Sequence, residues 1–278
     1  MATKLGSILT DMPFRPGIEF DPQPIIGTIQ PVPYGNVPDL IDGMTELGPA
    51  LIRSGMPHLS SFNDIYLALT RQVYEDAQEG KFLDPETVLH TMPIFGHLYE
   101  NPLLQFAQGN LDEVSEAWHY AFTSLFMRLA DPSCQFASCM GTHIQSDHPW
   151  ATFYSGVPDS YHHDYTYGIR KSIQTVITEK ASYYLPGPGP LRHIASTCVD
   201  NTIAGWRGGA WVDKDEIKKA HDLTAVAPAL GKEALDGIRR DLDLTAKRTA
   251  RFFTTIGTAA FRGASIVSPP RKISPVSI

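Results

Sequence analysis

Apolar residues recur every three or four positions over most of the chain, and this spacing predicts helices. The clearest stripes lie in residues 40–51, 62–73, 114–129, 169–177 and 235–256. Because positions i, i+3 and i+4 share one face of a helix, each stripe predicts an amphipathic helix with its apolar side toward a core. Convincing period-two alternation, which is typical of half-buried strands, is absent from the sequence. We therefore expect an all-α fold, a single domain of roughly eight packed helices.

Proline divides the chain into segments. Seven prolines between positions 12 and 38 disfavour a long helix or a central strand, and they predict a proline-rich N-terminal arm over residues 1–38. Residues 39–264 are expected to form the helical domain, followed by a C-terminal tail over residues 265–278. The sequence PGPGP at positions 186–190 predicts a break in the helices, either a lid or turn or an inert surface loop.

Proline also predicts where individual helices begin and end. Asp84 followed by Pro85 is a strong helix start, since aspartate accepts a hydrogen bond from an unpaired amide and proline fits the first turn. We expect this helix to bend or break near Pro93 and the segment to end at residues 101–102. A later helix is expected from about residue 133 to 150, limited by the proline at position 149.

Composition and charge narrow the class of protein. The chain carries 23 basic and 30 acidic side chains, a formal net charge of −7, so little would neutralise a phosphate backbone. There is no run of about 18 apolar residues and no apolar N-terminal core of a signal peptide, so no membrane span is expected. Cys134, Cys139 and Cys198 form no disulfide framework and no CxxC pair, and we interpret them as small core residues of a cytoplasmic protein.

The strongest candidate site lies in GTHIQSDHPWATF, residues 141–153. A helix would place His143 and Asp147 on one face, in line with Phe136 and Met140. Imidazole nitrogen and carboxylate oxygen both bind zinc, manganese or iron(II), so the pair predicts a site for one divalent metal ion. The alternative is a buried hydrogen-bonded pair with a structural role.

Several polar residues close in sequence could complete this site. The segment SYHHDYTYG at residues 160–168 follows the predicted helix and combines histidines, an aspartate and tyrosines that can transfer protons. Its alternative interpretation is a helix N-cap region with aromatic packing. The candidates are His148 and His162 as further metal ligands, and His163, Asp164 and Tyr165 as catalytic acids and bases.

Arg207 is the candidate for binding an anion. It lies between Trp206 and Trp211 in GWRGGAW, where it could clamp an anion or stack on a flat ligand. It could equally pair with an internal carboxylate.

A second pattern is an incomplete match to a di-iron site. Glu116 and His119 have the spacing ExxH, and Asp159 and His163 have the spacing DxxxH, as in helical carboxylate sites. The alternative is that Glu116 belongs to the solvated first turn of a helix, where acidic residues favour the helix dipole. Two further polar residues that could take part in chemistry are His193 and Asp200.

The usual cofactor signatures GxxxxGK[ST], GxGxxG, HExxH and GxSxG are absent. The sequence instead resembles an uncharacterised domain of unknown function found mainly in bacterial proteins, over roughly residues 40–261. The likeness is strongest at a GxHIxxDxP core, and it implies an all-helical fold with His143, Asp147 and Arg207 at the family's polar positions. It implies no activity. The segments that carry it are FNDIYLALTRQV, FLDPETV, MGTHIQSDHPWA, HDYTYGI and WRGGAW.

A fainter resemblance is to zinc-dependent phospholipase C and the single-strand nuclease of the same fold. These helical enzymes use HxxxD, a proline and a further histidine to hold metal ions, and His143, Asp147 and Pro149 match. The further histidine is replaced by Ala151 or Thr152, and the N-terminal tryptophan ligand is missing. The resemblance thus implies one ion rather than three.

These patterns leave three hypotheses open. The first is an enzyme acting on a small hydrophobic metabolite in a helical pocket, a hydrolase or lyase assisted by one Zn, Mn or Fe ion. The second is a metal-free cyclase or isomerase of a biosynthetic pathway that uses His, Asp and Tyr for proton transfer. The third is a non-catalytic binding or scaffold protein. We favour an enzyme because histidines and aspartates are concentrated between residues 143 and 164.

Overall fold

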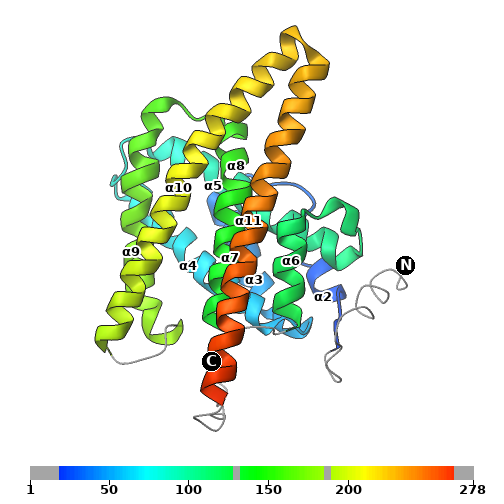
Figure 1. Ribbon diagram of the computed structural model, residues 1–278. Helices are drawn as coiled ribbons and strands as arrows, with labels where there is room; N and C mark the ends of the chain where they lie inside the picture. Colours follow the sequence, from blue (N-terminus) through cyan, green and yellow to red (C-terminus); the bar gives the residue numbers. More distant parts are fainter. Residues whose placement is uncertain (1–18, 128–131, 185–188, 266–278) are drawn as a thin grey trace.

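The computed structural model describes residues 19–127, 132–184 and 189–265, and this part of the chain is helical with no strand (Figure 1). The all-α prediction is confirmed. Short 3-10 turns occur at Leu111–Glu113 (η1) and Asp159–Tyr161 (η3), and π-helical turns at His143–Asp147 (η2) and Asp164–Gly168 (η4). The α-helices are α2 (Gln23–Ile26), α3 (Val37–Arg53), α4 (Pro57–Gln78), α5 (Pro85–Gln108), α6 (Glu116–Phe126), α7 (Pro132–Thr142), α8 (His148–Tyr154), α9 (Ile169–Tyr184), α10 (Gly189–Val226) and α11 (Pro228–Ser265).

The described part of the proline-rich arm packs into the core. Ahead of α3, which already begins at Val37, its prolines limit it to the four-residue helix α2, whose Ile25 is fully buried. Phe20 lies edge-on to Phe106 and Phe126, with ring centroids 6.1 and 5.5 Å away. Residues 19–38 are thus held by aromatic burial, which stabilises an irregular segment that has few backbone hydrogen bonds of its own.

Helix α5 begins as the sequence predicts and ends later. The Asp84 side chain accepts a hydrogen bond from the Thr87 amide, and Pro85 occupies the first turn. The prediction that the helix ends at residues 101–102 is wrong, because α5 runs to Gln108 with Pro93 and Pro102 inside it. Proline in a helix interior costs about 3 kcal/mol, and the burial of an apolar helix face outweighs that cost here.

The central helical rod combines α7, η2 and α8. The prediction that Pro149 limits this helix is wrong. Pro149 lies in the first turn of α8, where its missing N–H leaves no bond unmade, and α8 continues to Tyr154. The π-turn η2 shifts the backbone hydrogen bonds by one residue just before Pro149. The proline can therefore occupy the first turn of α8 without ending the rod.

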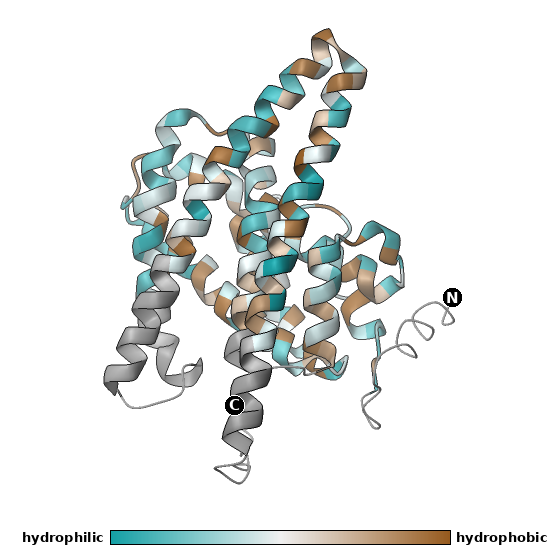
Figure 2. Ribbon diagram, in the orientation of Figure 1, coloured by the Kyte–Doolittle hydropathy of each residue, from teal (hydrophilic) through white to brown (hydrophobic). Residues whose placement is uncertain are grey.

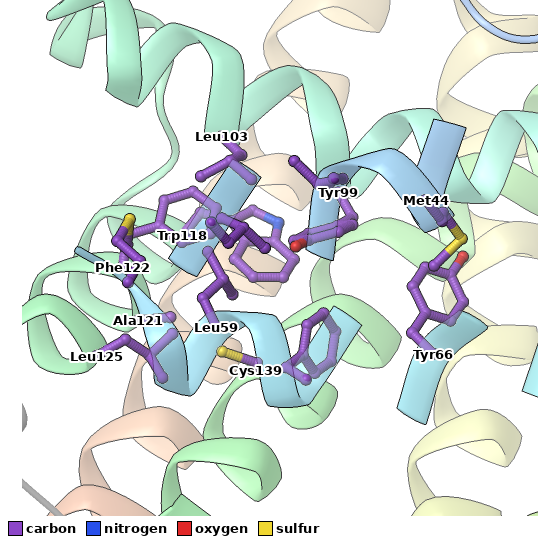
Figure 3. Packing of buried hydrophobic residues seen from close by; sticks show 14 of the residues in the cluster. Met44, Leu59, Tyr66, Tyr99, Leu103, Trp118, Ala121, Phe122, Leu125 and Cys139 are labelled. Atoms are coloured by element: carbon purple, nitrogen blue, oxygen red, sulfur yellow. The ribbon is translucent and has the colours of Figure 1, made fainter. Parts of the chain in front are cut away.

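The main core lies between α3, α4, α5, α6 and α7. Trp118 is fully buried at its centre, and Figure 3 shows it among Leu59, Tyr99, Leu103 and Phe122. Its indole stacks on Phe122 at 4.9 Å between ring centroids. This aromatic packing forms the rigid wall behind the candidate site.

Helices α10 and α11 form a long antiparallel hairpin that extends beyond the rest of the molecule (Figure 1). Their inner halves pack on α7, α8 and α9 and carry Arg207 toward the body. Apolar and polar residues are mixed along the projecting part (Figure 2), and Val226 and Leu230 near its tip are exposed. In the described part of the chain, no helix is long and apolar enough to cross a membrane.

Candidate functional site

A cavity of about 80 Å³ lies between α4, α5, η2, α9 and α10. Most of its lining is aliphatic or aromatic. Two imidazoles and one guanidinium interrupt this apolar surface, namely His143, His148 and Arg207. All three are almost completely buried, so each needs a partner or a function.

His143 is held by a chain of two hydrogen bonds. Its Nδ1 lies 2.8 Å from Oδ2 of Asp147, one turn further along. The same oxygen accepts a hydrogen bond of 2.8 Å from Nε1 of Trp118. The indole thereby orients the carboxylate, and the carboxylate orients the imidazole, as in sites where a base is positioned by a third group.

The other nitrogen of His143 has no hydrogen bond. His143 lines the cavity, and its Nε2 is buried with no partner among the residues that the structure describes. Burial lowers the pKa of His143 well below its ordinary value, so the ring is neutral. Burial raises the pKa of Asp147 well above its ordinary value, and hydrogen bonds from Trp118 and Ser146 offset only part of this shift. In the tautomer that donates Nδ1–H to Asp147, Nε2 of His143 carries a free lone pair.

His148 is oriented by a similar chain. The Tyr165 hydroxyl donates its single proton to the Arg207 carbonyl over 3.0 Å. It lies 3.2 Å from Nδ1 of His148, so that nitrogen must be the donor to the hydroxyl oxygen. Burial and the nearby Arg207 charge lower the pKa of His148 well below its ordinary value, which makes this ring neutral with Nε2 unprotonated as well.

Phe95 separates the two imidazoles. Its ring stacks on His143 with centroids 3.7 Å apart and on His148 with centroids 4.4 Å apart. Two rings at these distances on one face would overlap, so the imidazoles lie on opposite faces of Phe95. They present two separate basic nitrogens and do not converge on one point.

The two π-turns explain why these side chains meet. In a regular α-helix, residue i+5 is rotated by about 140° from residue i. In η2 the His148 amide bonds to the His143 carbonyl, and this wider turn brings both histidines to the cavity side. In η4 the Ile169 amide bonds to the Asp164 carbonyl, and Tyr165 within this turn reaches His148 and Arg207. π-turns of this kind are frequent at functional sites.

Gly141, the first residue of the GxHIxxDxP core, permits a close approach of helices. A Cβ atom at this position would lie 2.8 Å from Thr249 and 3.1 Å from Trp206. The glycine therefore lets α7 contact both α10 and α11, which brings the neighbouring Arg207 to the same cavity as His143.

The geometry gives no support to the predicted metal ligands. His143 Nδ1 and Asp147 bond to each other, and Phe95 keeps His148 from sharing an ion with His143. His162 is exposed and lies against Trp211, with ring centroids 4.8 Å apart. Within the described residues, no three His, Cys, Asp or Glu side chains lie close enough to hold one ion.

In the segment 160–168, some of the candidate residues are exposed and others have structural roles. Asp164 is buried and accepts hydrogen bonds from the amides of Leu83 and Asp84, at 2.9 and 2.6 Å, which fixes the chain just before α5. His163 is 57% exposed and lies outside the cavity lining. Tyr165 is buried behind His148 and positions it. Asp164 does not cap its own helix, and its two hydrogen bonds to the chain ahead of α5 indicate a structural role.

The di-iron pattern does not assemble either. Glu116 pairs with Lys247, and Asp159, with 97% of its side chain exposed, pairs with Lys214. His119 lies against Phe106, with ring centroids 6.3 Å apart. The side chains of His193 and Asp200, most of PGPGP, and the predicted tail lie outside the described residues.

Two residues of the site, Trp118 and Phe95, are not predicted as site residues from the sequence. Trp118 belongs to an apolar stripe and Phe95 to a segment in which a break is predicted. The indole N–H of Trp118 is a usable signal, because a buried tryptophan needs an acceptor. Phe95 carries no such signal, and only the fold places it between the imidazoles.

The sequence matches the profile of a protein family over residues 37–255, described as a family of unknown function, DUF5995. No curated protein and no solved structure matches the chain.

Proposed function

We propose that this chain, which belongs to the family of unknown function DUF5995, is an enzyme that transfers protons on a small, largely apolar molecule bound in the cavity. The observation that carries the proposal is the buried Nε2 of His143. His143 lines the cavity, and within the described part of the chain this nitrogen has no partner, while Asp147 and Trp118 fix the opposite side of the ring. A buried imidazole nitrogen with a free lone pair beside a largely apolar pocket is the arrangement required of a general base.

In this proposal His143 Nε2 takes a proton from a C–H or O–H group of the substrate. The imidazolium formed is stabilised by the Asp147 carboxylate, which is already in hydrogen-bond contact. If the imidazolium returns the proton to another atom of the substrate, the reaction is an isomerisation. If it passes the proton to a departing leaving group, the reaction is an elimination. His148 supplies a second basic nitrogen on the other face of Phe95.

The arrangement favours the metal-free cyclase or isomerase hypothesis over a metal-assisted hydrolase or lyase. Both imidazoles already have their Nδ1 atoms engaged, and their Nε2 atoms are held apart. We propose a cytoplasmic enzyme with a small-molecule substrate, a setting that suits the buried thiol of Cys139.

Metabolite profiling would test this function. Purified wild-type protein and the variants His143→Gln and His221→Gln would be incubated with a small-molecule extract, and the products compared by mass spectrometry and NMR. His221 is exposed and lies outside the cavity lining, so its variant is the matched control. We expect the wild type and His221→Gln to convert the same compound, and His143→Gln to lose at least about 100-fold in rate. Conversion by His143→Gln at the wild-type rate, or conversion by none of the three proteins, would overturn the proposal.

A further inference from the structure

Arg207 is a buried cation for which the described residues supply no counter-ion. Its side chain is 5% exposed, and Nη2 donates to the Tyr165 carbonyl over 2.7 Å while the guanidinium lies 4.2 Å above the Tyr165 ring. Nε is buried and has no hydrogen-bond partner in the part of the chain that the structure describes. Among these residues no carboxylate forms an ion pair with Arg207, and the groups that favour its charged form are Tyr165 and Tyr161. A neutral carbonyl and aromatic faces leave most of the positive charge uncompensated.

Within the described chain, the cavity lining therefore carries positive charge and no negative charge. Arg207 is the single permanently charged side chain among the described residues that line it, and no aspartate or glutamate is present there. Asp147 and Asp164 are close in sequence to lining residues, but their oxygens are bonded to Trp118 and His143 and to backbone amides. A ligand with an ammonium group would find no carboxylate partner in this lining and would be repelled by Arg207.

The rest of the lining selects an apolar body of limited size. The same lining includes an apolar surface supplied by Leu69, Val73, Val88, Met92 and Ile173. At roughly 10–15 Å³ for each water-sized group, a volume of about 80 Å³ has room for a ligand of about five to eight non-hydrogen atoms.

We propose that the substrate of this cavity is a small monocarboxylic acid with an apolar body and no amino group, its carboxylate paired with the Nε side of Arg207. The inference rests on the proposed function, since it takes the cavity to be the working site. Guanidinium and carboxylate match in planar geometry, and burial makes their hydrogen bonds strong. Pairing would satisfy the unpartnered Nε and compensate the buried charge in one contact.

Binding to the wild-type protein tests this without any substitution. Straight-chain carboxylates of about four to six carbons, their primary amides, and the 2-amino acid of the same chain length form matched probes for titration calorimetry and saturation-transfer NMR. We expect at least one acid to bind about 10-fold or more tightly than its amide, and the amino acid to bind more weakly than the acid. Equal binding of acid and amide, tighter binding of the amino acid, or no binding of any acid would overturn the inference.

Variants then assign the selectivity to Arg207. Arg207→Lys should retain a preference for acid over amide, and Arg207→Gln should lose it. Arg53→Gln, an exposed arginine on α3 outside the cavity, should behave as the wild type. A folded Arg207→Gln that keeps the full preference would contradict the assignment. If the protein binds the acids but converts no metabolite, the inferred ligand class stands and the proposed enzymatic function is refuted. If the protein converts a neutral compound, the enzymatic function stands and the inferred ligand class is refuted.

Discussion

The indole Nε1 of Trp118 donates to Oδ2 of Asp147 over 2.8 Å, and the same oxygen faces His143. One core tryptophan therefore holds the carboxylate that orients the candidate base. Both partners are buried. Loss of this hydrogen bond would therefore leave a buried polar atom unsatisfied, which costs free energy in addition to the bond itself.

Trp118→Phe tests this coupling. It removes the donor and keeps most of the aromatic volume, so we expect a loss of about 1–3 kcal/mol in the free energy of unfolding. Urea denaturation of Trp118→Phe, Asp147→Asn and the double variant gives a double-mutant cycle. The double variant should lose less than the sum of the single losses. Strictly additive losses would show that the two side chains act independently.

The ionisation of His143 can be measured directly. Burial lowers its pKa, so the ring should stay neutral on acidification through the ordinary histidine range near 6.5, with Nδ1 protonated and Nε2 free. Nitrogen-15 NMR of labelled protein between pH 5.5 and 8 reports both properties, and the variant His143→Gln identifies the signal. A His143 signal that titrates near 6.5, or one with the proton on Nε2, would contradict the assigned role.

Tyr165→Phe tests the chain that orients His148. The hydroxyl donates to the Arg207 carbonyl and accepts from His148, so its removal should cost about 1–3 kcal/mol of stability and leave His148 free to change tautomer. Tyr167→Phe is the matched control, since Tyr167 is two residues away and 64% exposed. Stability and nitrogen-15 spectra should be unchanged in the control. An unchanged His148 signal in Tyr165→Phe would rule out this chain.

Much of the fold follows from the sequence because helix periodicity and capping are local. The apolar stripes and the Asp84–Pro85 start predict helices that the structure contains. Helix ends are less predictable, as Pro93 and Pro102 show, because burial of the surrounding helix outweighs the local penalty of proline.

The site could be predicted only in part. His143 and Asp147 lie one turn apart on a local motif, so their contact is visible in the sequence. The placement of His148 and Tyr165 depends on two π-turns, which change the register by one residue and leave no periodic signal. Phe95 and Arg207 reach the cavity from distant helices by tertiary packing.

Asp164 should behave as a structural residue. It accepts two backbone hydrogen bonds ahead of α5, so Asp164→Ala should lower the free energy of unfolding by about 1–3 kcal/mol by leaving the amides of Leu83 and Asp84 unsatisfied. Asp159→Ala removes an exposed carboxylate nearby and should change stability by less than about 0.5 kcal/mol. Urea denaturation gives both values. A fully stable Asp164→Ala would remove the structural role.

Glu100 should make stability depend on pH. It is fully buried on α5, neither of its carboxyl oxygens has a hydrogen-bond partner among the described residues, and burial raises its pKa to about 7. The unfolded chain ionises this group near 4.5, so between these values the folded state binds more protons. The stability that Glu100 contributes is therefore present below pH 4.5 and is lost as the pH rises through 7.

Glu100→Gln replaces the acid with a neutral group of the same shape. We expect little change in the free energy of unfolding at pH 4.5, and a gain of about 1–3 kcal/mol at pH 8, where the wild type must bury a carboxylate. Urea denaturation at both pH values measures this, with the exposed Glu233→Gln as the control. Equal effects of Glu100→Gln at the two pH values would mean that the carboxyl group does not change ionisation within the folded interior.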